Sequence, residues 1–327
     1  MKAYFLGSKN SQPLLELRDI PKPEPKTGEV LIKVKAASLN RGELMVGHGP
    51  VAAGADAPPA PFGLDVSGEI AAIGPGVGGW KQGDRVISRV RHAFAEYALA
   101  DIRQVMAMPE PLSWEQAAAA PVVFLTAYDM LVEQGHLASG EWVLVTGVSS
   151  GVGVACLQIA KALGAKVIGT SGSAEKLKVI QPLGLDHAVL TRGPVSPEEM
   201  KRLTGGHGID IVINNVGGTV FEACVASLAY RGRLATVGYV DGSLSARMDL
   251  EAMHRNRLHL YGVSNKHRTA DERAASVVGF KRDILPHLAA GRIRPLVDKV
   301  FPFDQLREAQ ARMLANQAAG KVVISMG

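Results

Sequence analysis

The chain has 327 residues, of which 47% are hydrophobic, which is enough for a large core and about two domains. Its formal net charge of +5 suits an anionic ligand, but no block rich in Lys and Arg argues for nucleic acid as a partner. No stretch approaches the ~20 apolar residues of a membrane span. Cys156 and Cys224 both fall in apolar segments, so we expect a reduced, cytoplasmic protein without disulfides.

Short apolar segments with strand-like alternation dominate roughly the first 115 residues. We expect strands at residues 2–6, 14–17, 29–36, 66–73 and 85–87. Residues 47–61 are rich in Ala, Gly and Pro, which predicts an irregular, mobile loop. Ser113 is a typical helix N-cap and marks the start of a helical segment.

The middle of the chain contains a strand, a turn of small residues, a helix and a second strand. The Val-rich run 142–145 precedes a turn of small residues that ends at Gly153, residues 154–163 predict a helix, and residues 165–170 predict the second strand. This order is the context that a dinucleotide-binding turn requires. Small residues allow the backbone to approach a pyrophosphate, whose charge meets the free amides of the helix start. An ordinary buried crossover is the alternative, since Val148 and Ser150 replace two glycines of the G-x-G-x-x-G pattern.

Further apolar runs at 208–216, 231–237 and 258–264 alternate with helical segments and predict a doubly wound parallel sheet. A charged helix is expected from about residue 270 to 290, and another at 303–316. The apolar tail 321–324 predicts a strand, which we expect to rejoin the first domain because it needs a sheet.

The chain resembles the medium-chain dehydrogenase/reductase family, in the zinc-free quinone oxidoreductase and enoyl reductase-like branch. The resemblance is carried by residues 36–41 (AASLNR), 61–68 (PFGLDVSG), 83–86 (GDRV), 125–128 (LTAY), 146–153, 215–218 (NVGG), 232–234 (GRL) and 320–323 (GKVV). It implies an α/β fold in which a GroES-like, β-rich catalytic domain (residues 1–120 and 265–327) is split around an inserted doubly wound Rossmann domain (residues 121–264).

The resemblance also bears on a metal. At the positions where zinc-dependent relatives carry their ligands, this chain has Asn40, Leu64 followed by Asp65, and Val122. Leu and Val cannot bind zinc, which takes Cys, His or carboxylate ligands. We therefore expect a zinc-independent protein with no metal site.

The end of the second central strand indicates the cofactor. An NAD site carries Asp or Glu about 20 residues after the glycines, and Ser171 stands at that position here. Ser tolerates a 2′-phosphate, so we expect NADPH, with Lys176 or Arg192 either neutralising that phosphate or standing as ordinary solvated side chains. The fingerprint and the resemblance place the other cofactor contacts at Asn40, Thr126, Ser149, Ser150, Gly151, Val152, Gly153, Asn215, Val237, Gly238, Tyr239, Val263, Ser264 and Lys321.

The chemistry implied is hydride transfer from NADPH to a small-molecule acceptor, a quinone or an α,β-unsaturated carbonyl, because alcohol oxidation would lack its zinc Lewis acid. Asn40 would hydrogen-bond the nicotinamide ribose or a substrate carbonyl, and Thr126 would lie near the carboxamide. His48 stands where many relatives carry Tyr; it is either a proton donor or a histidine of a surface loop.

Two other functions stay open, an NADPH-binding protein of crystallin type with little turnover and a zinc-free enoyl-thioester reductase.

The family often dimerises through an edge strand of the cofactor domain, for which residues 257–263 are the candidate. We therefore expect a homodimer.

Overall fold

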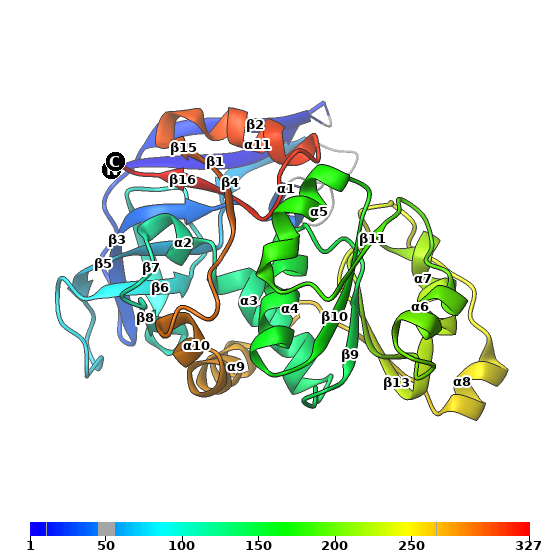
Figure 1. Ribbon diagram of the computed structural model, residues 1–327. Coiled ribbons are helices and arrows are strands. Elements are labelled where there is room, and N and C mark those ends of the chain that lie inside the picture. Colours follow the sequence, from blue (N-terminus) through cyan, green and yellow to red (C-terminus); the bar gives the residue numbers. More distant parts are fainter. Residues whose placement is uncertain (11, 45–55, 266) are drawn as a thin grey trace. The chain divides into compact units, whose positions relative to one another are not determined.

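The structure is a computed structural model that describes residues 1–10, 12–44, 56–265 and 267–327 (Figure 1). The chain divides into two compact units, residues 1–122 with 277–327, and residues 123–276. His48 lies outside the described residues. In the parts of the chain that the structure describes, no helix combines the length and the apolar character needed to cross a bilayer.

The first unit is built mainly of antiparallel strands. Its strands are β1 (Lys2–Lys9), β2 (Gln12–Asp19), β3 (Glu29–Ser38), β4 (Ala57–Pro61), β5 (Asp65–Ile73), β6 (Arg85–Arg89), β7 (Tyr97–Asp101), β8 (Val105–Ala107), β15 (Val297–Pro302) and β16 (Lys321–Ser325). One sheet has the order β2-β1-β4, and the other the order β15-β16-β3-β5-β6-β8, with β7 paired to β3. β16 pairs antiparallel with β3, so the prediction that the C-terminal strand rejoins the first domain is confirmed.

Short helices accompany these sheets. They are α1 (Arg41–Leu44), α2 (Trp114–Ala118), α10 (Leu285–Ala289) and α11 (Leu306–Leu314), while α3 (Pro121–Tyr128) and α9 (Ala270–Asp283) cross the unit boundaries. Ser113 caps α2 as predicted, in a capping box with Gln116. α11 is amphipathic, because Leu306, Ala309 and Met313 are buried at helical spacing.

Two expectations for this unit were wrong. Of the loop expected at 47–61, Ala57–Pro61 forms the strand β4, which pairs with β1 at the sheet edge. Its prolines hide the strand pattern, but an edge strand tolerates them because one side of it needs no donor. The single helix expected from 270 to 290 is in fact α9 and α10, because Pro286 lacks the amide hydrogen that would continue α9.

The second unit is a parallel sheet with helices packed on it. Its strands are β9 (Trp142–Val145), β10 (Lys166–Ser171), β11 (His187–Leu190), β12 (Ile209–Asn214), β13 (Leu228–Thr236) and β14 (His259–Gly262), in the order β11-β10-β9-β12-β13-β14. The helices are α4 (Gly151–Ala162), α5 (Ala174–Ile180), α6 (Pro197–Leu203), α7 (Gly218–Ala226) and α8 (Leu250–Asn256). α4 packs on β9 and β10, and α7 on β12 and β13 (Figure 1). The predicted doubly wound sheet is confirmed.

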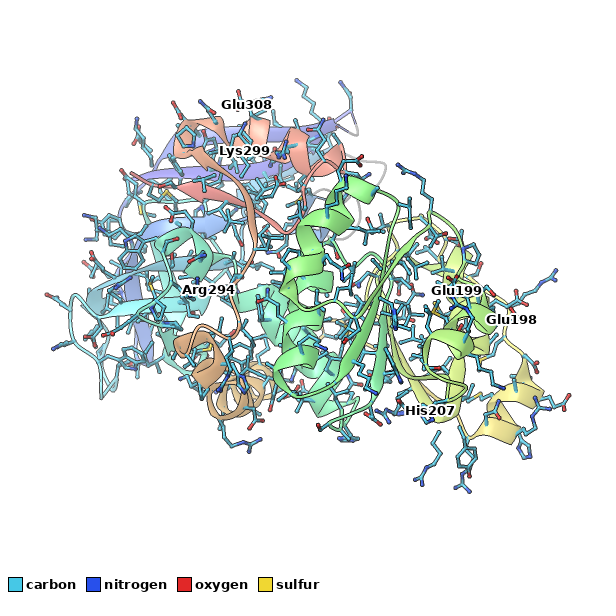
Figure 2. The ribbon with its side chains drawn as sticks, in the orientation of Figure 1. Glu198, Glu199, His207, Arg294, Lys299 and Glu308 are labelled. Carbon is cyan, nitrogen blue, oxygen red and sulfur yellow. The ribbon has the colours of Figure 1, made fainter. Side chains whose placement is uncertain are left out.

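Charged side chains stand on the outer faces of both units. Figure 2 shows Glu198 on α6 and His207 in the turn after it, and Lys299 on β15 and Glu308 on α11. All four are exposed, and His207 Nε2 lies 2.8 Å from Asp210 Oδ1. These residues form the solvated faces of elements whose other faces are buried, so they give no indication of a ligand.

Candidate functional site

The turn between β9 and α4 has the geometry of a phosphate-binding turn. Ser150 is the N-cap of α4, and its hydroxyl accepts a hydrogen bond of 3.0 Å from the Gly153 amide. A Cβ atom at Gly153 would lie 2.6 Å from the Gly147 carbonyl oxygen, so only glycine allows this close packing of helix on turn. Ser150, Gly151 and Val152 are partly exposed at the helix start. The free amides there suit an anionic group such as a pyrophosphate.

Polar side chains gather beyond the end of β10. The Ser171 hydroxyl is buried, lies 3.3 Å from the Ser149 hydroxyl and accepts from the Ser173 amide at 3.3 Å. The side chain of Arg192 lies over Gly172, because a Cβ atom there would be 2.6 Å from Arg192 Cγ. Ser173 caps α5 and accepts from the Lys176 amide, which keeps Lys176 in the first turn of that helix. The structure thus brings Ser171, Lys176 and Arg192 to one end of the sheet.

The loop after β12 is held by buried amide side chains, and the loop after β13 packs against it. Asn215 donates from its amide to the Thr146 carbonyl oxygen at 2.9 Å, which joins the ends of β12 and β9. Asn214, which the sequence analysis did not single out, holds the next turn by accepting from the Val216 and Gly217 amides. At Gly238, a Cβ atom would lie 2.8 Å from the Asn215 carbonyl oxygen. The predicted Asn215 and Val237–Tyr239 segments therefore pack against each other.

The chain that follows β14 contacts Thr126 through Asn265. The Val263 amide donates to the Thr236 carbonyl oxygen at 3.0 Å, which extends the alignment of β14 with β13. The next residues are Ser264, which is exposed, and Asn265, whose amide lies 3.4 Å from the Thr126 hydroxyl. Asn265 was not predicted. Its side chain connects the buried Thr126 with the end of β14.

In the first unit, a buried polar cluster forms around Asp65. Its carboxylate is fully buried and accepts from the Ser38 hydroxyl at 3.0 Å, the Asn40 amide at 2.8 Å and the Val122 backbone amide at 2.7 Å. Lys321 also donates to Asp65, at 3.1 Å, and to the Asn40 side-chain oxygen at 2.6 Å. Strand register assembles the cluster, because β3 pairs with both β5 and β16.

Glu43 joins this cluster through Asn40. One carboxyl oxygen, Oε1, accepts from the Asn40 amide at 2.6 Å, while Oε2 is buried and has no hydrogen-bond partner. The pKa of Glu43 is raised to about 8; burial is the largest cause, and the nearby Asp65 charge acts in the same direction. The Asn40 hydrogen bond and the charges of Lys321 and Arg89 act in the opposite direction. Glu43 is a site candidate that the sequence analysis missed, and Asp65 was named there only for its place at a zinc-ligand position of the relatives.

The residues at the zinc-ligand positions of the relatives surround Asp65. Asn40 bonds it through its side chain, Leu64 precedes it, and Val122 bonds it through the backbone. Within residues 1–10, 12–44, 56–265 and 267–327, no group of three or more His, Cys, Asp and Glu side chains is arranged to hold a metal ion.

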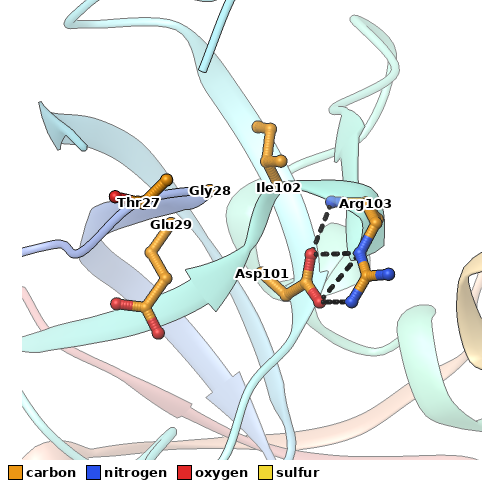
Figure 3. Close-up of a pocket in the computed structure, with 6 residues that line it drawn as sticks. All are labelled: Thr27, Gly28, Glu29, Asp101, Ile102 and Arg103. Atoms are coloured by element: carbon orange, nitrogen blue, oxygen red, sulfur yellow. Dashed lines mark hydrogen bonds and ion pairs between the residues drawn. The ribbon is translucent and has the colours of Figure 1, made fainter. Parts of the chain in front are cut away.

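A surface recess of about 340 Å³ lies elsewhere in the first unit (Figure 3). It is lined by Thr27, Gly28, Glu29, Asp101, Ile102 and Arg103. The Asp101 carboxylate is already engaged by Arg103, with the closest contact at 2.7 Å. None of the predicted site residues lines this recess, so we do not assign the reaction to it.

Comparison with known proteins defines the class of protein. Residues 26–110 match the family "Alcohol dehydrogenase GroES-like domain", and residues 151–277 match "Zinc-binding dehydrogenase". The quinone oxidoreductase of Homo sapiens is 32% identical over 333 residues, covering 99% of this chain and 97% of the relative. The chain therefore belongs to the medium-chain dehydrogenase/reductase family and is an oxidoreductase of its quinone oxidoreductase-like group.

Two solved structures share the fold over nearly the whole chain. An NAD-dependent alcohol dehydrogenase superposes with a TM-score of 0.87 at 32% identity, covering 100% of both chains. Mycobacterial Rv1454c, solved in complex with NADPH, superposes with a TM-score of 0.86 at 28% identity, covering 99% of both chains. Similar structures thus include an NAD-dependent protein and an NADPH complex, so fold alone does not decide which nucleotide binds here.

Proposed function

We propose that this protein is an NADPH-dependent reductase that transfers hydride to a quinone or an α,β-unsaturated carbonyl compound without zinc. The observation that carries the proposal is the environment of Asp65. The positions of the zinc ligands in relatives provide here the Asn40 amide, Leu64 and the Val122 backbone N–H, and the carboxylate of Asp65, which follows Leu64, is ion-paired with the ammonium of Lys321. The amide, the leucine and the N–H are not zinc ligands.

The second unit supplies the cofactor site in this proposal. The close approach at Gly153 and the free amides of α4 suit the pyrophosphate, and Ser171 with Arg192 suits a 2′-phosphate. When bound, the dihydronicotinamide supplies the hydride. We propose that the rest of the cofactor site is lined by Thr126, Asn215, Val237, Gly238, Tyr239, Val263 and Ser264. We propose that Asn40 and Lys321 of the first unit also contact the cofactor.

The first test is turnover with and without metal removal. Purified protein should oxidise NADPH in the presence of a quinone or an enone, contain no stoichiometric zinc, and keep its rate after treatment with a chelator. An enoyl thioester in the same panel tests the alternative substrate. NADPH binding without turnover on any acceptor would favour the crystallin-type alternative, and one zinc per chain with loss of activity on chelation would contradict the metal-free reaction.

A second test concerns assembly. β14 pairs with β13, and in the described part of the chain no strand covers its other side. An open edge is a liability unless it is paired or protected, so we propose that two copies join through β14. Sedimentation at micromolar concentration should give the mass of two chains, and a monomer would contradict this.

A further inference from the structure

The hydrogen bonds of Asn40 limit what it can offer a ligand. Its amide group has two hydrogens, and both are used, one toward Glu43 Oε1 at 2.6 Å and one toward Asp65 Oδ2 at 2.8 Å. Its side-chain oxygen already accepts from Lys321 and has one lone pair left. Asn40 can therefore accept from a hydroxyl group, such as that of a ribose, but it has no hydrogen left for a carbonyl oxygen.

Glu43 offers the donor that Asn40 lacks. Its side chain is buried, and Oε2 has no hydrogen-bond partner in the structure. A buried polar atom without a partner is costly, and such an atom in a native protein calls for an explanation. Because Oε1 is occupied by Asn40, a proton on this carboxyl resides on Oε2. A bound acceptor molecule seated against Asn40 would give that proton a partner.

We propose that the Glu43 carboxyl hydrogen-bonds the carbonyl oxygen of the electron acceptor and donates the proton that completes its reduction. This inference rests on the function proposed above. A C–H bond forms at the acceptor carbon as the C–H bond that held the hydride in the dihydronicotinamide breaks, and the electron pair of the π system moves to the carbonyl oxygen. The O–H bond at Oε2 then breaks as the new O–H bond forms on that oxygen, which gives an enol that tautomerises to the reduced product. Glu43 is left as a carboxylate and takes its next proton from solvent.

The surroundings of Glu43 suit both protonation states. Burial and the Asp65 charge disfavour the carboxylate, so that the pKa of Glu43 near 8 keeps the proton in place at neutral pH. After transfer, the Asn40 amide and the charges of Lys321 on β16 and Arg89 on β6 stabilise the carboxylate. A general acid works best when its pKa lies near the operating pH.

The test compares Glu43→Gln with the wild type and with Glu69→Gln, the same change at a partly exposed carboxylate that is ion-paired with Lys35 at 3.3 Å. Loss of a general acid lowers kcat by about 10²-fold or more. The loss should be larger with an enone than with a quinone, because an enolate is a stronger base than a hydroquinone anion. NADPH affinity should be unchanged, the fall of wild-type kcat above about pH 8 should vanish in Glu43→Gln, and Glu43→Asp should restore part of the rate.

A second measurement does not depend on activity. The infrared band of a protonated carboxyl should be present in the wild type and in Glu69→Gln at pH 7, absent in Glu43→Gln, and lost in the wild type as the pH rises through about 8. Unchanged kcat in Glu43→Gln, or a Glu43 that is already ionised at pH 6, would overturn the proton-donor role while leaving the reductase intact. A wild type that reduces no acceptor would overturn the proposed function and this role together.

Discussion

Replacing Lys321 with Met should lower the free energy of unfolding by about 3–5 kcal/mol, the range observed when one partner of a buried ion pair is removed. The side chains of Lys321 and Asp65 are only 5% and 0% exposed, so the remaining carboxylate would have no compensating charge and little water. Denaturant unfolding followed by circular dichroism measures the difference.

Lys161→Met is the matched control. Lys161 makes an ion pair of 2.8 Å with Asp186, but their side chains are 29% and 31% exposed. Because exposed ion pairs contribute about 1 kcal/mol or less, the free energy of unfolding of this variant should stay close to that of the wild type. Equal losses in the two variants would show that the Lys321 pair does not stabilise the first unit more than a surface pair does.

The fold was predictable where the determining pattern is local. The alternation in β3 and β5, the Ser113 cap and the order of strand, turn and helix from residue 142 all lie within short windows. The prediction was wrong where proline altered a pattern, at β4 and between α9 and α10. In both places the backbone hydrogen bonds of the sheet edge or the helix determine the structure, and hydrophobic periodicity does not record them.

The candidate site divides in the same way. The β9–α4 turn was predictable because its parts are contiguous in sequence. The cluster of Glu43, Asp65 and Lys321 was not, because strand register brings together residues as far apart as Asn40 and Lys321, 281 positions away. One signal could have found it: Asp65 and Lys321 are the first residues of β5 and β16, and the three residues that follow each of them are buried. A charge in that position rarely remains buried without a partner.

NADPH should bind more tightly than NADH, and Ser171→Asp should reverse part of that preference. A carboxylate at Ser171 would repel the 2′-phosphate of NADPH and could accept a hydrogen bond from the ribose hydroxyl of NADH. Arg192→Ala, which removes a guanidinium lying over Gly172, should lower the affinity for NADPH and leave the affinity for NADH nearly unchanged. One charge-assisted hydrogen bond contributes about 1.5–3 kcal/mol, which corresponds to about 10–150-fold in affinity. Lys176→Ala tests the second candidate cation in the same way.

Titration of both nucleotides by fluorescence decides between these outcomes. Ser139→Asp adds the same charge at an exposed position before β9, at the opposite end of its strand from the turn, and Arg202→Ala removes an exposed arginine of α6. Because neither residue lies near the end of β10 in sequence or in the sheet, both variants should keep the wild-type preference. If the wild type binds NADH as tightly as NADPH, or if Arg192→Ala and Lys176→Ala both weaken NADPH no more than Arg202→Ala does, then the end of β10 is not the site that recognises the 2′-phosphate.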